Sequence, residues 1–206
     1  MNVRTFCTLL LLASFVSSNV YAQKPDGNNL VLRYNWTIQS SSTLTEGGKV
    51  ISLSGYATKD WYRTSVPTTV LAALVANKVY SDPYYGNNYM ELPGMRRWDK
   101  PEGNPFESSW WYRTEFDLPS DYAGKHVWLK FHSVNYGANL WVNGQKVVDS
   151  TLMEGAYRLY SFDIAQYIKA GQKNCLALEI YPPKTFDLTI SWVDWKSELR
   201  DRREGI

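Results

Sequence analysis

Few residues in this chain of 206 have the types and spacing needed for metal or nucleophilic chemistry. Its only histidines, His126 and His132, lie six positions apart in one predicted strand, where alternation puts them on the same face. Extended backbone separates them by about 20 Å, so they cannot share a metal ion, and we expect both to be exposed. The sequence contains no G-x-S-x-G, P-loop, G-x-G-x-x-G or H-E-x-x-H motif. We therefore expect neither a metal nor a cofactor.

Carboxylates are numerous, but none forms a recognisable pair. Glycoside hydrolysis, for example, needs two carboxylic residues roughly 5–9 Å apart across a cleft. Asp117, Asp121 and Asp149 fall on predicted strand faces or in turns, where solvation explains them. Cys175 lies in the strand-like stretch N-C-L-A-L-E-I and is interpreted as a small buried hydrophobe. We predict that the chain has no catalytic residues and is not catalytic by itself.

Aromatic residues stand out in the composition, with nine Trp and fifteen Tyr. Strand faces and sandwich cores favour aromatics, and flat aromatic surfaces also stack on sugar rings, so composition leaves both interpretations open. The formal net charge of +2, with acidic and basic residues interspersed, argues against nucleic acid or an anionic membrane as a partner.

The N-terminus has the pattern of an export signal. Arg4 supplies a positive charge, residues 9–16 form an apolar run, and Val20-Tyr21-Ala22 is a small-residue cleavage site before Gln23. The apolar run is shorter than the roughly 20 residues that a transmembrane helix needs. We predict that residues 1–22 are a signal peptide cleaved after Ala22 and that the protein is secreted or periplasmic.

The elements that must position any site are mostly strands. In residues 110–118 and 127–132 apolar side chains alternate with polar ones, and residues 140–142 lead into Asn143-Gly144, a dipeptide typical of two-residue hairpin turns. A period of two indicates one buried and one exposed face per strand. This is the pattern of an antiparallel β-sandwich.

Weaker patterns predict the remaining elements. Further strands are expected at residues 30–38, 49–55, 157–164, 174–181 and 187–195. Residues 65–78 predict the only helix, with Pro67 in its first turn, an apolar stripe facing the sandwich and Asn77 at its end. Residues 81–105 are crowded with Pro, Gly and Asn, which predicts a long loop of the kind that often carries function.

Five ordered motifs resemble one family. W-Y-R-x-x-F-x-L-P at 111–119 and A-x-L-W-V-N-G at 138–144 are similar to the N-terminal sugar-binding domain of glycoside hydrolase family 2. V-P-T-T-V-L-A-A-L (66–74), S-D-P-Y-Y-G-N-N (81–88) and D-L-T-I-S-W-V-D-W (187–195) resemble its exo-β-glucosaminidase and β-mannosidase branch. The resemblance implies an all-β fold over residues 23–195, a galactose-binding-like jelly-roll β-sandwich with one short helix.

The resemblance also implies site residues. In that branch the aspartate of the W-V-D-W segment reaches into the pocket of a catalytic barrel and hydrogen-bonds the terminal sugar. The matching residue is Asp194, with Trp195 beside it, and a carboxylate can accept from two sugar hydroxyls. The alternative is that Asp194 merely ends a strand. The loop residues Tyr84, Tyr85, Asn87 and Asn88 are expected near the interface with the barrel.

After Trp195 the sequence departs from the family, because residues 196–206 lack its proline-rich turn. We interpret them as a truncated linker stub, and the family's catalytic glutamates belong to a barrel that is missing or separately encoded. We predict a non-catalytic domain that binds carbohydrate and supports a secreted glycoside hydrolase of exo-β-glucosaminidase, β-mannosidase or β-galactosidase type. The chain would be a truncated or split product of that enzyme. Its ligand would be a β-linked hexose or hexosamine. The alternatives are an independent carbohydrate-binding module and a structural domain that pairs with a separate barrel.

Overall fold

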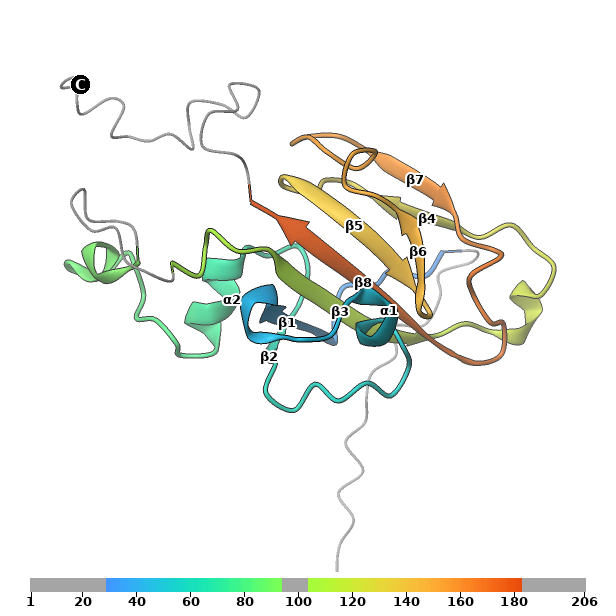
Figure 1. Cartoon of the computed structure of the whole chain (residues 1–206), viewed down its shortest axis with the longest axis horizontal. Helices are drawn as coiled ribbons and strands as arrows, with labels where there is room; N and C mark the ends of the chain where they lie inside the picture. The colour runs from blue at the N-terminus through green and yellow to red at the C-terminus, as the bar shows by residue number, and fades with distance from the viewer. Residues whose placement is uncertain (1–28, 94–103, 183–206) are drawn as a thin grey trace, which may run out of the picture.

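The computed structural model describes residues 29–93 and 104–182 (Figure 1). A six-stranded antiparallel sheet has the order β2-β1-β3-β8-β5-β6, and a second sheet pairs β4 with β7. The strands are β1 (Trp36–Ser40), β2 (Tyr62–Thr64), β3 (Trp110–Asp117), β4 (Trp128–Phe131), β5 (Gly137–Val142), β6 (Gln145–Val148), β7 (Tyr160–Asp163) and β8 (Lys173–Tyr181). The helical elements are α1 (Gly48–Ile51), α2 (Val70–Ala76) and the 3₁₀ turns η1 (Ser41–Thr43), η2 (Asn88–Glu91) and η3 (Ser120–Tyr122). None of the helices in these ranges is long and apolar enough to cross a membrane.

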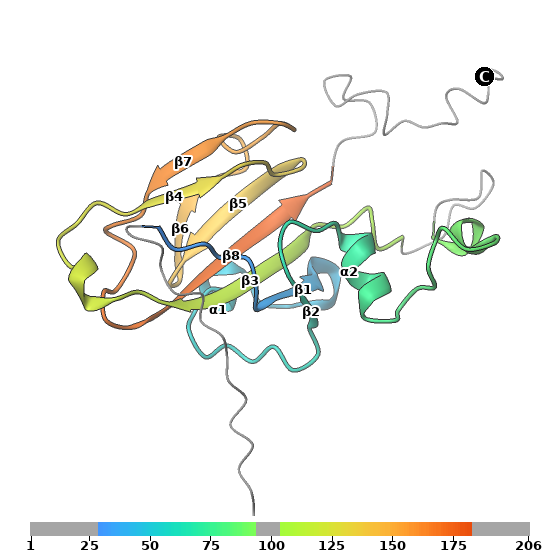
Figure 2. The same ribbon diagram turned by 180° about the vertical axis from the view of Figure 1, so that it is seen from behind.

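The main core lies on one face of the large sheet. The small sheet lies near β5, β6 and β8 in both views of the molecule (Figures 1 and 2). Ile38, Leu140 and Leu176 are completely or almost completely buried, and Leu129 and Phe162 of the small sheet pack against this core. The predicted all-β, galactose-binding-like jelly-roll sandwich is therefore confirmed, and its two faces of apolar side chains supply the burial that stabilises it.

The hairpin predicted from Asn143-Gly144 is confirmed, since this dipeptide joins β5 to β6. Both residues have positive φ, 49° at Asn143 and 85° at Gly144, as a two-residue turn of this kind requires. The strand predicted at 174–181 is likewise present as β8, and it pairs with β3 on one side and β5 on the other.

The expectation of one exposed face per strand is wrong for β3. Trp111 and Arg113, on the face predicted to meet solvent, have exposed fractions of 3% and 5%. A second core covers this face of the sheet and contains Ile51 and Trp61 from a segment far upstream, packed with Trp111 and Ala177. The alternation of polar and apolar residues correctly predicts which side chains share a face of β3, but both faces are covered by other parts of the protein.

Residues 49–55, predicted as a strand, instead begin in the short helix α1 and continue into turns. The backbone turns at Gly47, which is the N-cap, and the Ser52 hydroxyl donates to the carbonyl oxygen of Gly48 at 2.6 Å. Only Ile51 of the apolar residues here is fully buried, whereas Val50 and Leu53 are exposed. The apolar spacing of this stretch fits one helical turn as well as a strand, and tertiary packing decides between them.

Three other predicted elements are shorter than expected. The strand predicted from residue 30 begins at Trp36, because Asn35 has a φ of 63°. The strand predicted from residue 157 begins at Tyr160, because Tyr157 has a φ of 62°. The predicted helix is present as α2, but its N-cap is Thr69, whose hydroxyl accepts a hydrogen bond from Ala72 N at 3.1 Å. The prediction that Pro67 lies in the first turn is therefore wrong, because Pro67 precedes the N-cap.

Candidate functional site

One end of the large sheet gathers the segments that the motifs single out. At this end β3 begins, β8 ends and β5 begins, with Trp110 opposite Ile180 and Gly137 opposite Tyr181. The long loop after α2 also starts here (Figure 1). This end, which we call the β8-exit end, is therefore where the candidate site is built.

The predicted loop residues Tyr84 and Tyr85 project from this end into solvent. Their exposed fractions are 96% and 77%, far above what an aromatic side chain retains inside a fold. Asp82 shapes the loop, because its carboxylate accepts from Tyr84 N at 2.9 Å and its carbonyl accepts from Asn88 Nδ2 at 2.8 Å. Two exposed aromatic faces held on a turn could stack on a sugar ring or on an apposed protein surface.

The two asparagines of the same loop have different local roles. Asn87 precedes η2, and its carbonyl accepts from Met90 N at 2.9 Å. The Asn88 side chain is used within the loop, in the bond to Asp82. The structure thus places all four predicted loop residues on one turn.

A polar cluster that the sequence did not predict lies at the β8-exit end. The Glu179 carboxylate accepts from Ser109 Oγ and from Asn139 Nδ2, each at 3.1 Å, and Asn139 Nδ2 also donates to the Tyr181 hydroxyl at 2.9 Å. The cluster continues to Ser41, whose Oγ lies 2.7 Å from Ser109 Oγ. These bonds join η1, the residue before β3, β5 and β8 at the point where β8 ends.

The environment of this cluster raises the pKa of the Tyr181 phenol. Burial raises the pKa of Tyr181 well above its usual value, and the hydrogen bond and negative charge of Glu179 raise it further. Tyr181 therefore stays protonated and serves as a neutral hydroxyl. A glutamate inside the otherwise apolar run L-A-L-E-I-Y was the available signal for this cluster, since a carboxylate in a central strand requires hydrogen-bonding partners.

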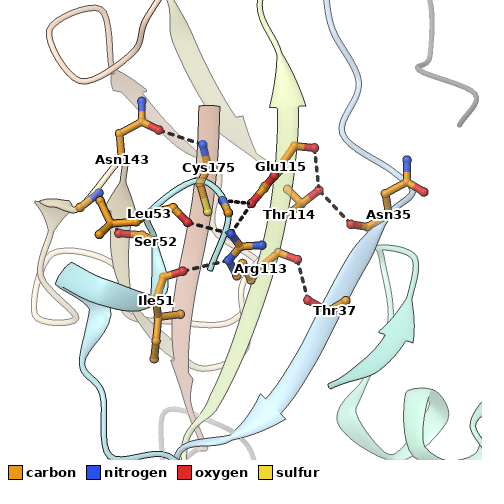
Figure 3. A network of polar contacts seen from close by, with 12 residues as sticks. Asn35, Thr37, Ile51, Ser52, Leu53, Arg113, Thr114, Glu115, Asn143 and Cys175 are labelled. Atoms are coloured by element: carbon orange, nitrogen blue, oxygen red, sulfur yellow. Dashed lines mark hydrogen bonds and ion pairs between the residues drawn. The ribbon is translucent and has the colours of Figure 1, made fainter. Parts of the chain in front are cut away.

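A second unpredicted cluster attaches the segment that includes α1 to the large sheet, and Figure 3 shows this cluster at close range. The buried Arg113 guanidinium donates to the carbonyl oxygens of Ile51 at 2.9 Å and Leu53 at 2.8 Å. It also pairs with Glu115, which accepts from Gly55 N at 2.8 Å. Arg113 therefore attaches the α1 region to β3.

The charge pair changes the acidity of Glu115. Partial burial by itself raises the pKa of this carboxyl. The hydrogen bonds from Arg113 and Gly55 N, together with the charges of Arg113 and Lys173, outweigh that effect and hold the pKa below its usual value. Because both partners serve the fold, we assign this cluster a structural role.

The remaining predictions on reactive residues have mixed outcomes. Asp194 and Trp195 lie outside the described residues, so their predicted sugar contact stays a prediction. Cys175 is confirmed as a buried thiol, and burial raises its pKa to about 12. His126 is exposed, as predicted, but it precedes β4 and is hydrogen-bonded to Asp163. Within residues 29–93 and 104–182, no three His, Cys, Asp or Glu side chains gather as metal ligands would.

Comparison with known proteins agrees with this architecture. An exo-β-D-glucosaminidase of Amycolatopsis orientalis is 34% identical over 172 residues, which cover 83% of this chain and 15% of that enzyme. A mannosylglycoprotein endo-β-mannosidase of Lilium longiflorum is 30% identical over 167 residues, covering 71% of this chain and 16% of that enzyme. The crystal structure of the A. orientalis exo-chitosanase CsxA matches with a TM-score of 0.66 at 30% identity, over 76% of this chain and 17% of that one.

The chain thus spans less than a fifth of the length of each of these relatives. Residues 36–192 match the family described as the glycosyl hydrolase 2 galactose-binding domain-like domain, a range that includes both sheets. The chain belongs to the glycosyl hydrolase 2 galactose-binding domain-like family.

Proposed function

We propose that this chain is the N-terminal support domain of a glycoside hydrolase that acts on β-linked glucosamine or mannose. The observation that carries the proposal is its identity of 34% and 30% to an exo-β-D-glucosaminidase and an endo-β-mannosidase, in each case over a small part of the relative. In this role the chain supports a catalytic barrel, on the same or a separate polypeptide, and has no turnover of its own.

The β8-exit end suits that role. The hydrogen bonds of Glu179 with Ser109 and Asn139 fix the end of β8, from which the chain continues toward Asp194. A rigid end to the last central strand limits where the following residues can reach. We propose that Asp194 and Trp195 contribute one wall of the barrel's pocket and that Asp194 accepts hydrogen bonds from hydroxyls of the terminal sugar.

A second candidate function is an independent carbohydrate-binding module. It is favoured by the exposure of Tyr84 and Tyr85, which offer aromatic faces without any catalytic partner. The two functions differ in what the chain does alone, because a module binds sugar by itself and a support domain needs the barrel to complete the pocket.

Calorimetry on the purified chain separates the two functions. Chitosan and mannan oligosaccharides are titrated into wild-type protein and into Asp194→Ala, with Asp60→Ala as the matched control for loss of one exposed carboxylate. If the folded protein binds neither oligosaccharide, the result favours the role of a support domain. Millimolar or tighter binding by the chain alone shows an independent module, and loss of that binding in Asp194→Ala but not in Asp60→Ala assigns it to Asp194.

The absence of turnover is tested on the same preparation. p-Nitrophenyl β-D-glucosaminide and the corresponding mannoside are incubated with the chain, and nitrophenolate release is compared with a buffer blank. Release above the blank that survives repurification would contradict the proposal that the chain is non-catalytic.

We also propose that the protein is exported and that residues 1–22 are removed. Mass spectrometry of the protein recovered from the medium or periplasm should show an N-terminus at Gln23. Recovery of the full-length chain from the cytosol alone would overturn this proposal.

A further inference from the structure

A second candidate site lies at the end of the sandwich opposite the β8-exit end. Here the stretch around η3 meets the connection between β7 and β8, at the end of the large sheet away from α2 (Figures 1 and 2). A hollow of about 660 Å³, open to solvent, lies between the two segments. Its polar and aromatic lining comprises Tyr122, Lys125, His126, Gln166, Lys169 and Gln172.

The charge in this hollow has one sign. Lys125 and Lys169 both line it, both are exposed, and neither ammonium group is bonded to a carboxylate within the described residues. No aspartate or glutamate lines the hollow. The lining residue His126 is hydrogen-bonded through its ring to the carboxylate of Asp163. Two unpaired ammonium groups around one concavity attract an anionic ligand.

An exposed indole lies two positions along the chain from the lining residue His126. Trp128 follows His126 by two residues and is directly opposite Asp163 in the β4–β7 pair. Its exposed fraction is 57%, on the outer face of the small sheet, away from the core side chains Leu129 and Phe131. An indole face left in water is a stacking surface for a flat or ring-shaped ligand with apolar C–H groups.

One residue of the lining, Tyr122, has an unsatisfied polar atom. The hydroxyl of Tyr122 is buried, and it is the only buried side-chain oxygen within residues 29–93 and 104–182 that lacks a hydrogen-bonding partner. Such an atom costs free energy unless water or another group completes its bonding. Lys125 Nζ lies over the Tyr122 ring, 5.4 Å from its centroid, so a cation and an aromatic ring are in contact in the lining.

We propose that this hollow binds a saccharide that carries an anionic group, a carboxylate or a sulfate ester. Lys125 and Lys169 hold the anion, the glutamine amides of the lining bind ring hydroxyls, and the Trp128 indole stacks on a neighbouring sugar. The site does not depend on a catalytic barrel, because all of its residues come from the described part of this chain. It is independent of the function proposed above.

The test uses the full chain and four probes in calorimetry at low ionic strength. These probes are a trigalacturonate, a sulfated oligosaccharide, neutral maltotriose and inorganic sulfate. We expect the two anionic saccharides to bind, and maltotriose to bind at least about tenfold more weakly. Preference for trigalacturonate or for the sulfated sugar identifies the source of the anion.

Variants assign the binding to the hollow. Lys125→Gln/Lys169→Gln should weaken binding of the anionic saccharides at least about tenfold, and the charge-matched control Lys59→Gln/Lys78→Gln should not. Trp128→Ala should weaken saccharide binding but leave any binding of inorganic sulfate unchanged, which separates stacking from charge. Thermal melting confirms that each variant is folded.

Three results would overturn the proposal. The first is no detectable binding of either anionic saccharide to the folded chain. The second is an equal loss in the control pair, which would mean that only overall charge attracts the ligand. The third is unchanged affinity in Lys125→Gln/Lys169→Gln.

Discussion

Gly48 lies directly against the indole ring of Trp141. A Cβ built on Gly48 would meet ring atoms Cε2, Nε1 and Cδ2 at a separation that real Cβ atoms do not adopt. The first residue of α1 therefore approaches β5 as closely as backbone can. This approach seats Ile51 in the second core over Ala177.

Gly48→Ala should destabilise the protein by about 1–3 kcal/mol, because the indole or the helix must move to admit one methyl group. The adjacent Gly47→Ala is the matched control, since a Cβ there has nothing within 4 Å. We expect it to cost less than about 1 kcal/mol, the size of an N-cap effect. Urea unfolding followed by tryptophan fluorescence measures both. Equal stability of the two variants would refute the close contact.

Arg113→Met should cost roughly 2–4 kcal/mol of unfolding free energy. The substitution removes the donors to the carbonyl oxygens of Ile51 and Leu53 and leaves Glu115 without its partner. Arg63→Met, at an exposed position of β2, is the control and should change stability by no more than about 0.5 kcal/mol. Protease digestion offers a second readout, because the α1 segment should become susceptible to cleavage in Arg113→Met alone.

The Glu115 pair should make stability depend on pH in the acid range. The pKa of Glu115 is depressed in the folded state. Its contribution is therefore fully present above the unfolded value of about 4.3 and is lost as pH falls through the folded value. Unfolding free energies of wild type and Glu115→Gln are measured at several pH values from 7 down to 3. Their difference should shrink below about pH 4.3, and a constant difference would count against the pair.

Cys175 should resist thiol reagents in the native protein. Burial raises its pKa to about 12, so at pH 8 almost no thiolate is present, and the side chain is fully buried. In a Cys7→Ser background, iodoacetamide should leave the native chain unlabelled and label it fully in guanidinium. Rapid native labelling, with the fold intact, would show that the β3–β8 region opens readily.

The parts of the fold that the sequence predicted are those with a local cause. Asn143-Gly144 specifies its own turn, and Thr69 with the apolar residues that follow specifies α2. The strand at β8 was equally visible, because a long apolar run without proline or glycine has few alternatives.

The errors have a nonlocal cause. Arg113 and Trp111 look solvent-facing in their own strand, and only a segment about 60 residues upstream buries them. The same docking makes residues 48–51 helical, against the strand that their apolar residues suggested. Predicting either feature requires knowing the other, which a single sequence does not provide.

The residues of the candidate site likewise fall into those that a local motif predicts and those that only the folded sheet brings together. The motif singles out Tyr84 and Tyr85, which are exposed in the structure, and their place at an interface stays a prediction. The sequence does not predict the role of Glu179, because its partners Ser109, which precedes β3, and Asn139 of β5 lie 70 and 40 positions away. Cross-strand register brings them together, and register is a property of the whole sheet.

Ser52 couples two distant stretches of the chain through one hydroxyl. It donates to Gly48 within α1 and accepts from Gly144 N in the β5–β6 turn at 3.0 Å, across 92 positions of sequence. We therefore expect the α1 segment to reach its final position after β3 and the β5–β6 hairpin have assembled. Closing such long loops is slow, so we expect this segment to be the last to gain protection from hydrogen exchange during refolding. Until α1 docks, the face of β3 that carries Trp111 lacks its cover, and we expect self-association to be most favourable at that stage.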